Sequence, residues 1–165
     1  MAQVDPIGLA GLADEDTLTG KYLIFTLGEE LYGMEIRYIT EIIGIQPITE
    51  VPEMPTYVKG VTNLRGKIIP VMDARLRFKK VEREYDDRTC IVVLDTNAVS
   101  VGLIVDSVAE VLTLTEDEIA PPPEVGRGAH KYIQGIGKSE GKVILLLDSQ
   151  RLLSDDELDS LSAIG

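Results

Sequence analysis

The chain has 165 residues, enough for one domain or for two small modules that share a hydrophobic core. Its formal net charge of −12 opposes binding to phosphate backbones and anionic membranes, so we expect neither nucleic-acid binding nor direct membrane insertion. A single cysteine, the lack of a signal peptide and the lack of an apolar run of membrane-spanning length predict a cytoplasmic protein.

The order of elements along the chain predicts an all-β fold. Residues 1–19 are acidic and aperiodic, and we expect a mobile tail before a folded domain of residues 20–161. Residues 21–36 read as two strands around a turn at residues 28–30, and residues 58–73 read as a second strand pair that turns near residues 65–67. Further strands are expected within residues 89–95, 99–108, 110–115, 132–137 and 142–148.

Three other segments depart from this strand pattern. Isoleucines at positions 36, 39, 42 and 43 have helical spacing and predict a short helix. Residues 46–57 contain three prolines, too many for a regular element. Ser154 and Glu157 form a capping-box pattern that predicts a C-terminal helix over residues 154–161. Pro70 cannot donate a backbone hydrogen bond, so we expect it at a sheet edge or a bulge.

The sequence contains an internal repeat. Residues 57–73 align without gaps on residues 132–148, and residues 33–43 align on residues 102–112 in the same order. This order predicts two similar modules, roughly residues 20–83 and 84–153, each with about five short strands that suit a small, partly closed barrel. In this alignment Ile39 matches Val108 and Ile42 matches Val111.

Residues that could carry chemistry are few. Cys90 lies in an apolar strand, where a buried thiol is inert. His130 is the single histidine and has no serine or cysteine nucleophile in a recognisable motif. No phosphate-binding loop and no metal-ligand spacing occur in the sequence. We therefore expect no enzymatic activity, no cofactor and no metal.

Two surface features can be interpreted in more than one way from the pattern alone. Arg65 at a turn is typical of a solubilising charge, and Glu41 is typical of a solvated face. The isoleucine stripe of residues 36–43 fits a core position more often than an interface. Four apolar residues on so short a segment nevertheless cannot all point one way, so some should meet the second module or a partner.

Residues 60–78, GVTNLRGKIIPVMDARLRF, resemble the signature of the CheW family of bacterial chemotaxis coupling proteins. Residues 25–36, 39–44, 101–114 and 145–158 are similar to the flanking family segments, so the resemblance runs from about residue 21 to residue 161, nearly the whole folded chain. It implies two SH3-like five-stranded β-barrels packed on a shared core, with short helices. It also implies a non-enzymatic adaptor, cytoplasmic and recruited to membrane receptor arrays.

The resemblance further implies partners and site residues. The partners are a CheA-type histidine kinase and the cytoplasmic tip of a methyl-accepting chemoreceptor. The alternative is a protein-binding regulatory module, such as a CheA-like regulatory domain or a CheV-like fragment, in another signalling array. The matching positions of the receptor groove are Ile36, Ile39, Glu41, Ile42, Arg65, Val108 and Val111. The matching positions of the kinase-binding face are Lys59, Gly60 and Asn63.

Overall fold

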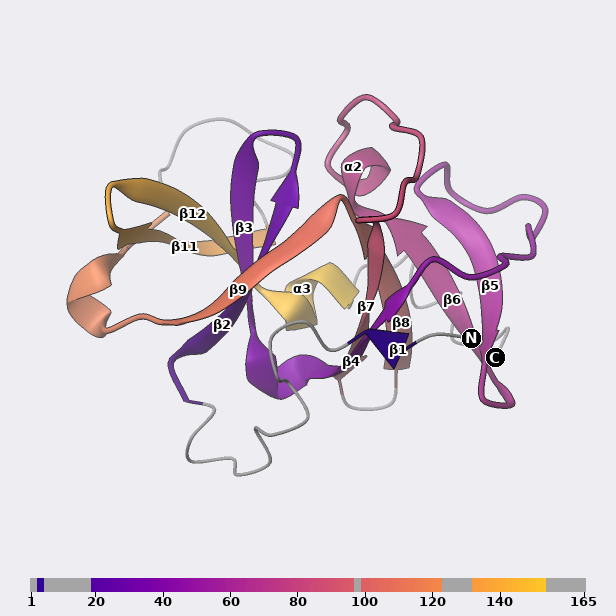
Figure 1. The fold of residues 1–165 in the computed structure, drawn as a ribbon, viewed down its shortest axis with the longest axis horizontal. Helices are drawn as coiled ribbons and strands as arrows, with labels where there is room; N and C mark the ends of the chain where they lie inside the picture. Colours follow the sequence, from indigo (N-terminus) through magenta and orange to yellow (C-terminus); the bar gives the residue numbers. More distant parts are fainter. Residues whose placement is uncertain (1–2, 5–18, 97–98, 123–131, 154–165) are drawn as a thin grey trace.

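The computed structural model describes residues 3–4, 19–96, 99–122 and 132–153, and these residues form two sheets of six strands each (Figure 1). In sheet A the strand order is β1-β4-β7-β8-β6-β5, and in sheet B it is β10-β11-β12-β3-β2-β9. Each sheet has five strands of six or seven residues and one of two residues, which confirms the predicted all-β fold with two five-stranded modules. The strands are β1 (Gln3–Val4), β2 (Lys21–Leu27), β3 (Glu30–Glu35), β4 (Ile39–Gly44), β5 (Val58–Leu64), β6 (Lys67–Asp73), β7 (Cys90–Thr96), β8 (Val99–Val105), β9 (Ser107–Thr113), β10 (Ile119–Ala120), β11 (Ile133–Ser139) and β12 (Lys142–Leu147).

The helices of the described residues are short. They are η2 (Ile36–Tyr38), α2 (Ala74–Arg77), η3 (Glu116–Glu118) and α3 (Ser149–Leu153). The helix predicted across the isoleucine stripe is wrong, because only η2 is helical and the chain continues as strand β4. Isoleucine is β-branched and favours strands, and its spacing here is compatible with either element. The helix predicted at residues 154–161 lies outside the described residues.

The predicted hairpins are confirmed. β2 pairs with β3 around Gly28–Glu29, and β5 pairs with β6 around Arg65–Gly66. Residues 45–57 form no regular strand or helix, as their prolines predict. Pro70 lies opposite Val61 of β5, while the pairing of β6 with β8 starts only at Val71, so the missing N–H leaves the ladder intact. The predicted N-terminal tail contains one short strand, β1, which pairs with β4.

The repeat is visible in the hydrogen bonds. Asp73 donates its backbone N–H to the carbonyl of Tyr57, and Asp148 donates to the carbonyl of Tyr132, both at 2.7 Å. These two aspartates are equivalent in the repeat. Asp73 accepts hydrogen bonds from the backbone N–H groups of Arg75 and Leu76 in α2, and Asp148 accepts one from the backbone N–H of Arg151 in α3. Each repeat therefore ends its last hairpin with the same capped helix.

The two sheets do not coincide with the two sequence repeats. β3 pairs in parallel with β12, with Gly33 opposite Leu146, and β6 pairs in parallel with β8, with Val71 opposite Gly102. These two pairings are equivalent in the repeat, but each joins strands from different copies. The modules predicted at residues 20–83 and 84–153 thus exchange strands, so that β2 and β3 of the first copy complete sheet B and β7 and β8 of the second copy complete sheet A.

The shared hydrophobic core is confirmed. One cluster of buried side chains includes Leu23 and Phe25 of β2 in sheet B and Val92 and Leu94 of β7 in sheet A. Leu152 of α3 belongs to the same cluster, and Figure 1 shows α3 between the two modules. Full burial of one such side chain contributes about 1.5–3 kcal/mol. The exchanged strands and the common core make the two modules one cooperative unit.

Candidate functional site

The predicted groove residues on η2 and β4 are mostly core residues. Ile36 and Ile42 are 2% and 1% exposed, and Ile39 is 8% exposed. All three belong to the cluster shared by both sheets. A register shift in the pairing of β4 with β7 lies between Ile39 and Glu41, and such a bulge re-aims the side chains around it. Ile36 and Ile42 are therefore inaccessible to a partner, and Ile39 is only slightly exposed.

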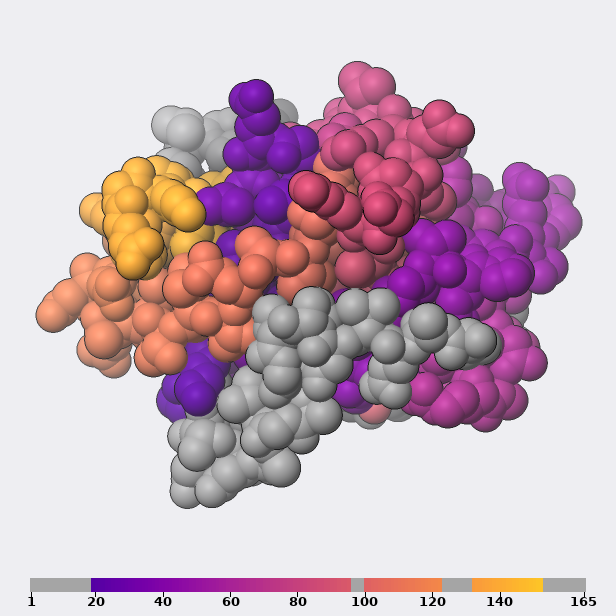
Figure 2. All heavy atoms as spheres, in the orientation of Figure 1, coloured from indigo at the N-terminus to yellow at the C-terminus, as the bar shows by residue number. Residues whose placement is uncertain are grey.

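Val108 and Val111 on β9 are half-buried and pack against this same cluster. They lie opposite Phe25 and Leu23 of β2. The structure thus brings the repeat-related residues Ile39 and Val108 to one core cluster, as the alignment predicts. Figure 2 shows the atoms of β9 on the front surface of the molecule, beside the segment of residues 79–89. Of the predicted groove positions, the two valines and Arg65 are the accessible ones.

Glu41 and Arg65 form an ion pair between β4 and the tip of the β5–β6 hairpin. The Glu41 side chain is 7% exposed, whereas that of Arg65 is 60% exposed. Oε1 of Glu41 accepts the hydrogen bond from Arg65, and its Oε2 is buried without a hydrogen-bond partner among the described residues. Arg65 therefore covers a buried carboxylate, and its loss would leave that charge without compensation.

The hairpin tip holds Arg65 in place by its backbone. Arg65 has a φ of 51° and Gly66 a φ of 89°, values that fit a turn with both central residues in the left-handed region. Oδ1 of Asn63 accepts a hydrogen bond from the Gly66 backbone N–H at 2.7 Å. The turn thus fixes the direction of the arginine, and part of the Asn63 side chain is used to stabilise it.

The predicted kinase-binding residues Lys59, Gly60 and Asn63 all lie on β5. The Lys59 ammonium pairs with Glu82 at 2.8 Å and lies 5.9 Å from the centroid of the Tyr85 ring. The Tyr85 hydroxyl donates to Asp73 at 2.7 Å, and burial together with this hydrogen bond raises the pKa of Tyr85 above its ordinary value. Lys59 is therefore held against the segment of residues 78–89.

A charged network that sequence reasoning missed lies where the chain passes from sheet A to sheet B. Asp106 is the single residue between β8 and β9, and its carboxylate accepts hydrogen bonds from Arg75 at 2.6 and 2.8 Å, from Arg83 at 3.0 Å and from the Gly28 N–H at 2.7 Å. Burial favours a raised pKa of Asp106, but the hydrogen bonds from Arg75, Gly28 and Arg83 outweigh it and hold this pKa below its ordinary value. No local motif reveals this network, because its members lie between 23 and 78 residues from Asp106.

A second link between the sheets is aromatic. The Arg77 guanidinium of α2 lies over the rings of Tyr57 and Tyr132, 4.4 and 4.5 Å from their centroids, and it donates to the Tyr132 hydroxyl. The two tyrosines are equivalent in the repeat. Arg77 therefore connects the same position of both copies, a role that the alignment of the tyrosines alone does not reveal.

The described residues offer little for catalysis or metal binding. Burial raises the pKa of the Cys90 thiol, which donates to the Arg88 carbonyl at 3.2 Å. Within residues 3–4, 19–96, 99–122 and 132–153, no group of three His, Cys, Asp or Glu side chains is placed to hold a metal ion. His130 lies outside the described residues. In the same part of the chain, no helix is long and apolar enough to cross a membrane.

Comparison with known proteins points to one family. Residues 21–157 match the model of the CheW-like domain. Chemotaxis protein CheW of Klebsiella aerogenes is 40% identical over 156 residues, which cover 91% of this chain and 94% of that protein. Chemotaxis protein CheW of Treponema pallidum is 35% identical and 84% of each chain is covered. The crystal structure of the scaffolding protein TtCheW from Thermoanaerobacter tengcongensis superposes with a TM-score of 0.77 at 36% identity, covering 84% of this chain and 94% of that one.

Proposed function

Because this chain belongs to the CheW family of chemotaxis proteins, we propose that it is a signalling adaptor that couples a CheA-type histidine kinase to methyl-accepting chemoreceptors. The observation that carries the proposal is the family match across residues 21–157, which includes every described strand except β1 and the whole shared core. The similarity to a scaffolding protein of the same fold supports an assembling role. Fold similarity alone would not suffice, since one fold serves many functions.

The receptor side of the proposal uses the accessible residues of the predicted groove, Val108, Val111 and Arg65. Val108 and Val111 provide half-buried apolar contacts, and Ile39 lies at the edge of the same cluster. Arg65 adds an exposed charge that is oriented by the buried carboxylate of Glu41. Half-buried apolar side chains suit the apolar face of an amphipathic helix, which a chemoreceptor tip would present. Ile36 and Ile42 act here as support and not as contacts.

The kinase side uses the exposed part of β5. Lys59, Gly60 and Asn63 lie on this strand, and Asn63 is exposed. Because Lys59 is paired with Glu82, it presents a fixed orientation to a partner.

The proposal needs no catalytic group of this chain. Its partners would supply the kinase activity and the membrane attachment, and the chain itself would stay in the cytoplasm at a receptor array. With a net charge of −12, recruitment to that array would depend on protein contacts and not on anionic lipids.

The test is reconstitution from purified components. The chain is mixed with a CheA-type kinase and with receptor signalling fragments in vesicles, and kinase autophosphorylation and co-sedimentation are measured. We expect one assembly that contains all three proteins and a rise in kinase activity that requires the chain. Binding of neither partner by the folded chain would refute the adaptor function.

A further inference from the structure

Strand β9, which carries the two accessible valines of the predicted receptor groove, is the last strand of sheet B. Among the described strands it pairs with β2 alone. Val108 and Glu110 lie opposite the adjacent residues Phe25 and Ile24, so that Ala109 is an extra residue on β9. Such a bulge separates the register on its two sides. The position of Val108 therefore depends on what holds the start of β9.

The start of β9 is held by Asp106, the single residue between β8 of sheet A and β9 of sheet B. Toward sheet B, its backbone N–H donates to the Thr26 carbonyl at 3.1 Å, and its carboxylate accepts from the Gly28 N–H at 2.7 Å. The hydroxyls of Ser107 and Thr26 share a hydrogen bond of 2.7 Å. Toward sheet A, Arg75 of α2 donates two hydrogen bonds to the carboxylate, at 2.6 and 2.8 Å. Asp106 is therefore bonded to both sheets at the point where the chain passes between them.

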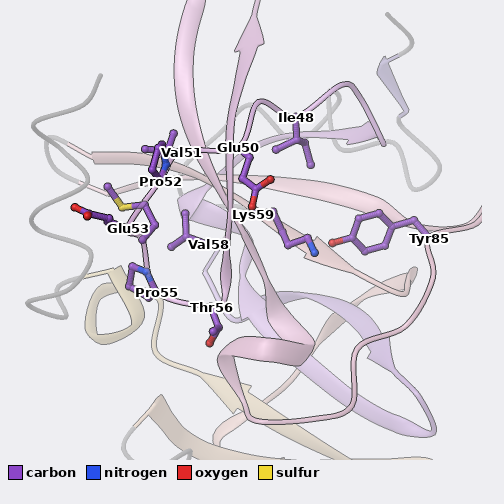
Figure 3. Close-up of a pocket in the computed structure, with 11 residues that line it drawn as sticks. Ile48, Glu50, Val51, Pro52, Glu53, Pro55, Thr56, Val58, Lys59 and Tyr85 are labelled. Atoms are coloured by element: carbon purple, nitrogen blue, oxygen red, sulfur yellow. The ribbon is translucent and has the colours of Figure 1, made fainter.

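A third group of contacts reaches Asp106 from the segment of residues 78–89. Arg83 of this segment donates to the carboxylate at 3.0 Å. The segment is itself fixed to sheet A, because Lys59 of β5 points toward the Tyr85 ring and lies 5.9 Å from its centroid (Figure 3). The cations that hold the carboxylate are thus supplied by α2, which directly follows β6, and by a segment packed on β5.

The network places Asp106 out of reach of a partner. Its side chain is 10% exposed, and its carboxylate already accepts four hydrogen bonds. Hydrogen bonds between charged groups are stronger than neutral ones and fix a geometry, above all where an arginine donates two of them. Val108 lies only two residues further along the chain. Any effect of Asp106 on partner binding therefore acts through the position of β9 and not through contact.

We propose that Asp106 is a positioning residue for receptor binding, which ties the start of β9 to sheet A and thereby fixes the place of Val108. The inference rests on the proposed function, because Val108 belongs to the groove assigned to the receptor. The alternative is that Asp106 only stabilises the fold. In that case a substitution that leaves the chain folded would leave receptor affinity unchanged.

The experiment compares the full chain with Asp106→Asn, which removes the charge at the centre of the network. Ile91→Ala is the control for stability, since Ile91 is fully buried in a cluster that contains none of the predicted groove residues. Loss of a buried isoleucine side chain should cost at least as much stability as the loss of the network. Asp87→Asn is the control for charge, because Asp87 is exposed and forms no ion pair with another described residue.

Two properties are measured for each folded variant. Titration calorimetry gives the affinity for a soluble fragment of the chemoreceptor tip and for the regulatory domain of the kinase. Methyl resonances of the valines, recorded without a partner, report the place of Val108, and those of the exposed Val143 on β12 serve as the reference. A general loss of stability moves neither property as long as the chain stays folded.

We expect about fivefold weaker receptor binding for Asp106→Asn, with kinase binding unchanged. The Val108 resonances should shift, and those of Val143 should stay in place. Ile91→Ala and Asp87→Asn should bind the receptor fragment as the unchanged chain does and leave the Val108 resonances where they are.

Two further variants test the network itself. Arg75→Gln should also weaken receptor binding, and its combination with Asp106→Asn should weaken it less than the two separate losses together predict. If Asp106→Asn does not fold, Arg83→Gln removes the outer cation alone and should weaken receptor binding about twofold and shift the Val108 resonances. Arg88→Gln is its charge control, because Arg88 is exposed and its side chain forms no ion pair with another described residue.

Receptor affinity of folded Asp106→Asn equal to that of the unchanged chain would overturn the positioning role and leave the adaptor function standing. An equal loss of receptor affinity in Ile91→Ala, or unchanged Val108 resonances in Asp106→Asn, would overturn it as well. An unchanged chain that binds no receptor fragment would instead refute the proposed function, and the Val108 resonances would still decide whether Asp106 fixes the start of β9.

Discussion

The two hairpins at residues 58–73 and 133–147 have the same backbone and different side chains. Arg65 and Glu140 are equivalent in the repeat, and both have a φ of 51°, each followed by a glycine with positive φ. Arg65 reaches the buried carboxylate of Glu41, whereas Glu140 is exposed and forms no ion pair with the described residues. The repeat thus preserves the turn, and only the first copy places on it a charge that is paired with a buried carboxylate of the same sheet.

The same contrast recurs at other equivalent positions. Asp106 of the second copy is buried in a network of cations, and its counterpart Arg37 is 55% exposed and pairs with Glu35. A Cβ added at Gly60 would collide with the backbone of Thr49, whereas a Cβ added at its counterpart Gly135 would first contact a side-chain methyl of Ile119. Equivalent backbone positions therefore differ in what surrounds them, and each pair gives a matched test.

The largest effect is expected for the pair Ile39 and Val108. The groove interpretation taken alone predicts that arginine is tolerated at both positions. Because Ile39 is 8% exposed and packs in the shared core, Ile39→Arg should lower the free energy of unfolding by about 4 kcal/mol, and Val108→Arg by about half of that. Urea denaturation of both variants checks this. Equal stabilities would show that Ile39 is as accessible as Val108.

Gly60 and Gly135 come next. Gly60→Ala should cost about 3 kcal/mol, because its φ is strained for alanine and the rigid Thr49 backbone must move. Gly135→Ala should cost less, about 1 kcal/mol, because its φ is not strained for alanine and its closest contact is a side-chain methyl of Ile119 and not backbone. Thermal unfolding of both variants compares them. If Gly135→Ala proved the more damaging, the loop of residues 45–57 would not be held as described.

Substitutions of Asp106 and of Arg37 should differ by a smaller amount in their effect on the free energy of unfolding. Asp106→Asn should cost about 2 kcal/mol through the loss of a charge-assisted network, and Arg37→Gln about 0–1 kcal/mol. The folded-state pKa of Asp106 lies below its unfolded value of about 3.9, so its contribution is complete above that value and is lost as the pH falls.

The stability difference between the unchanged chain and Asp106→Asn should therefore be constant between about pH 5 and pH 7 and shrink below about pH 4. Urea denaturation at several pH values measures it. A difference that grows as the pH falls would mean that the carboxylate is not stabilised in its charged form.

The smallest effect on stability is expected at the hairpin tips. Arg65→Gln should cost about 1 kcal/mol, because it uncovers the buried carboxylate of Glu41, and Glu140→Gln should cost nearly nothing. The melting temperatures of the two variants provide the comparison. A melting temperature of Arg65→Gln equal to that of the unchanged chain would mean that the ion pair does not stabilise the fold.

Local patterns were sufficient to predict much of the fold. The hairpin at residues 58–73 has β-branched runs on both sides of an Arg65–Gly66 turn, and such a signal needs no long-range information. The helix prediction for the isoleucine stripe was wrong because the spacing of the isoleucines fits both a helix and a strand. Pairing of this segment with β7 makes it a strand. The family resemblance puts Glu41 and Arg65 in one predicted groove, and the structure shows that they form an ion pair.

The exchange of strands could not be predicted from the repeat. An alignment shows that β6 resembles β12, but it does not say whether β3 pairs with one or the other. The Asp106 network depends on that exchange, because it joins segments from both copies. The position of the loop of residues 45–57 depends on the backbone hydrogen bonds between Thr49 and Val61, and this irregular loop has no repeat counterpart of equal length.

The comparison of the two hairpin tips can be tested in function by one measurement. Receptor-dependent activation of the kinase is assayed with the unchanged chain, Arg65→Gln and Glu140→Gln at equal concentration, below the melting temperature of each. If only the first hairpin tip carries a charge needed for coupling, Arg65→Gln should require an about tenfold higher concentration for activation. Glu140→Gln should require the same concentration as the unchanged chain. Equal losses in the two variants, or none in either, would contradict the account.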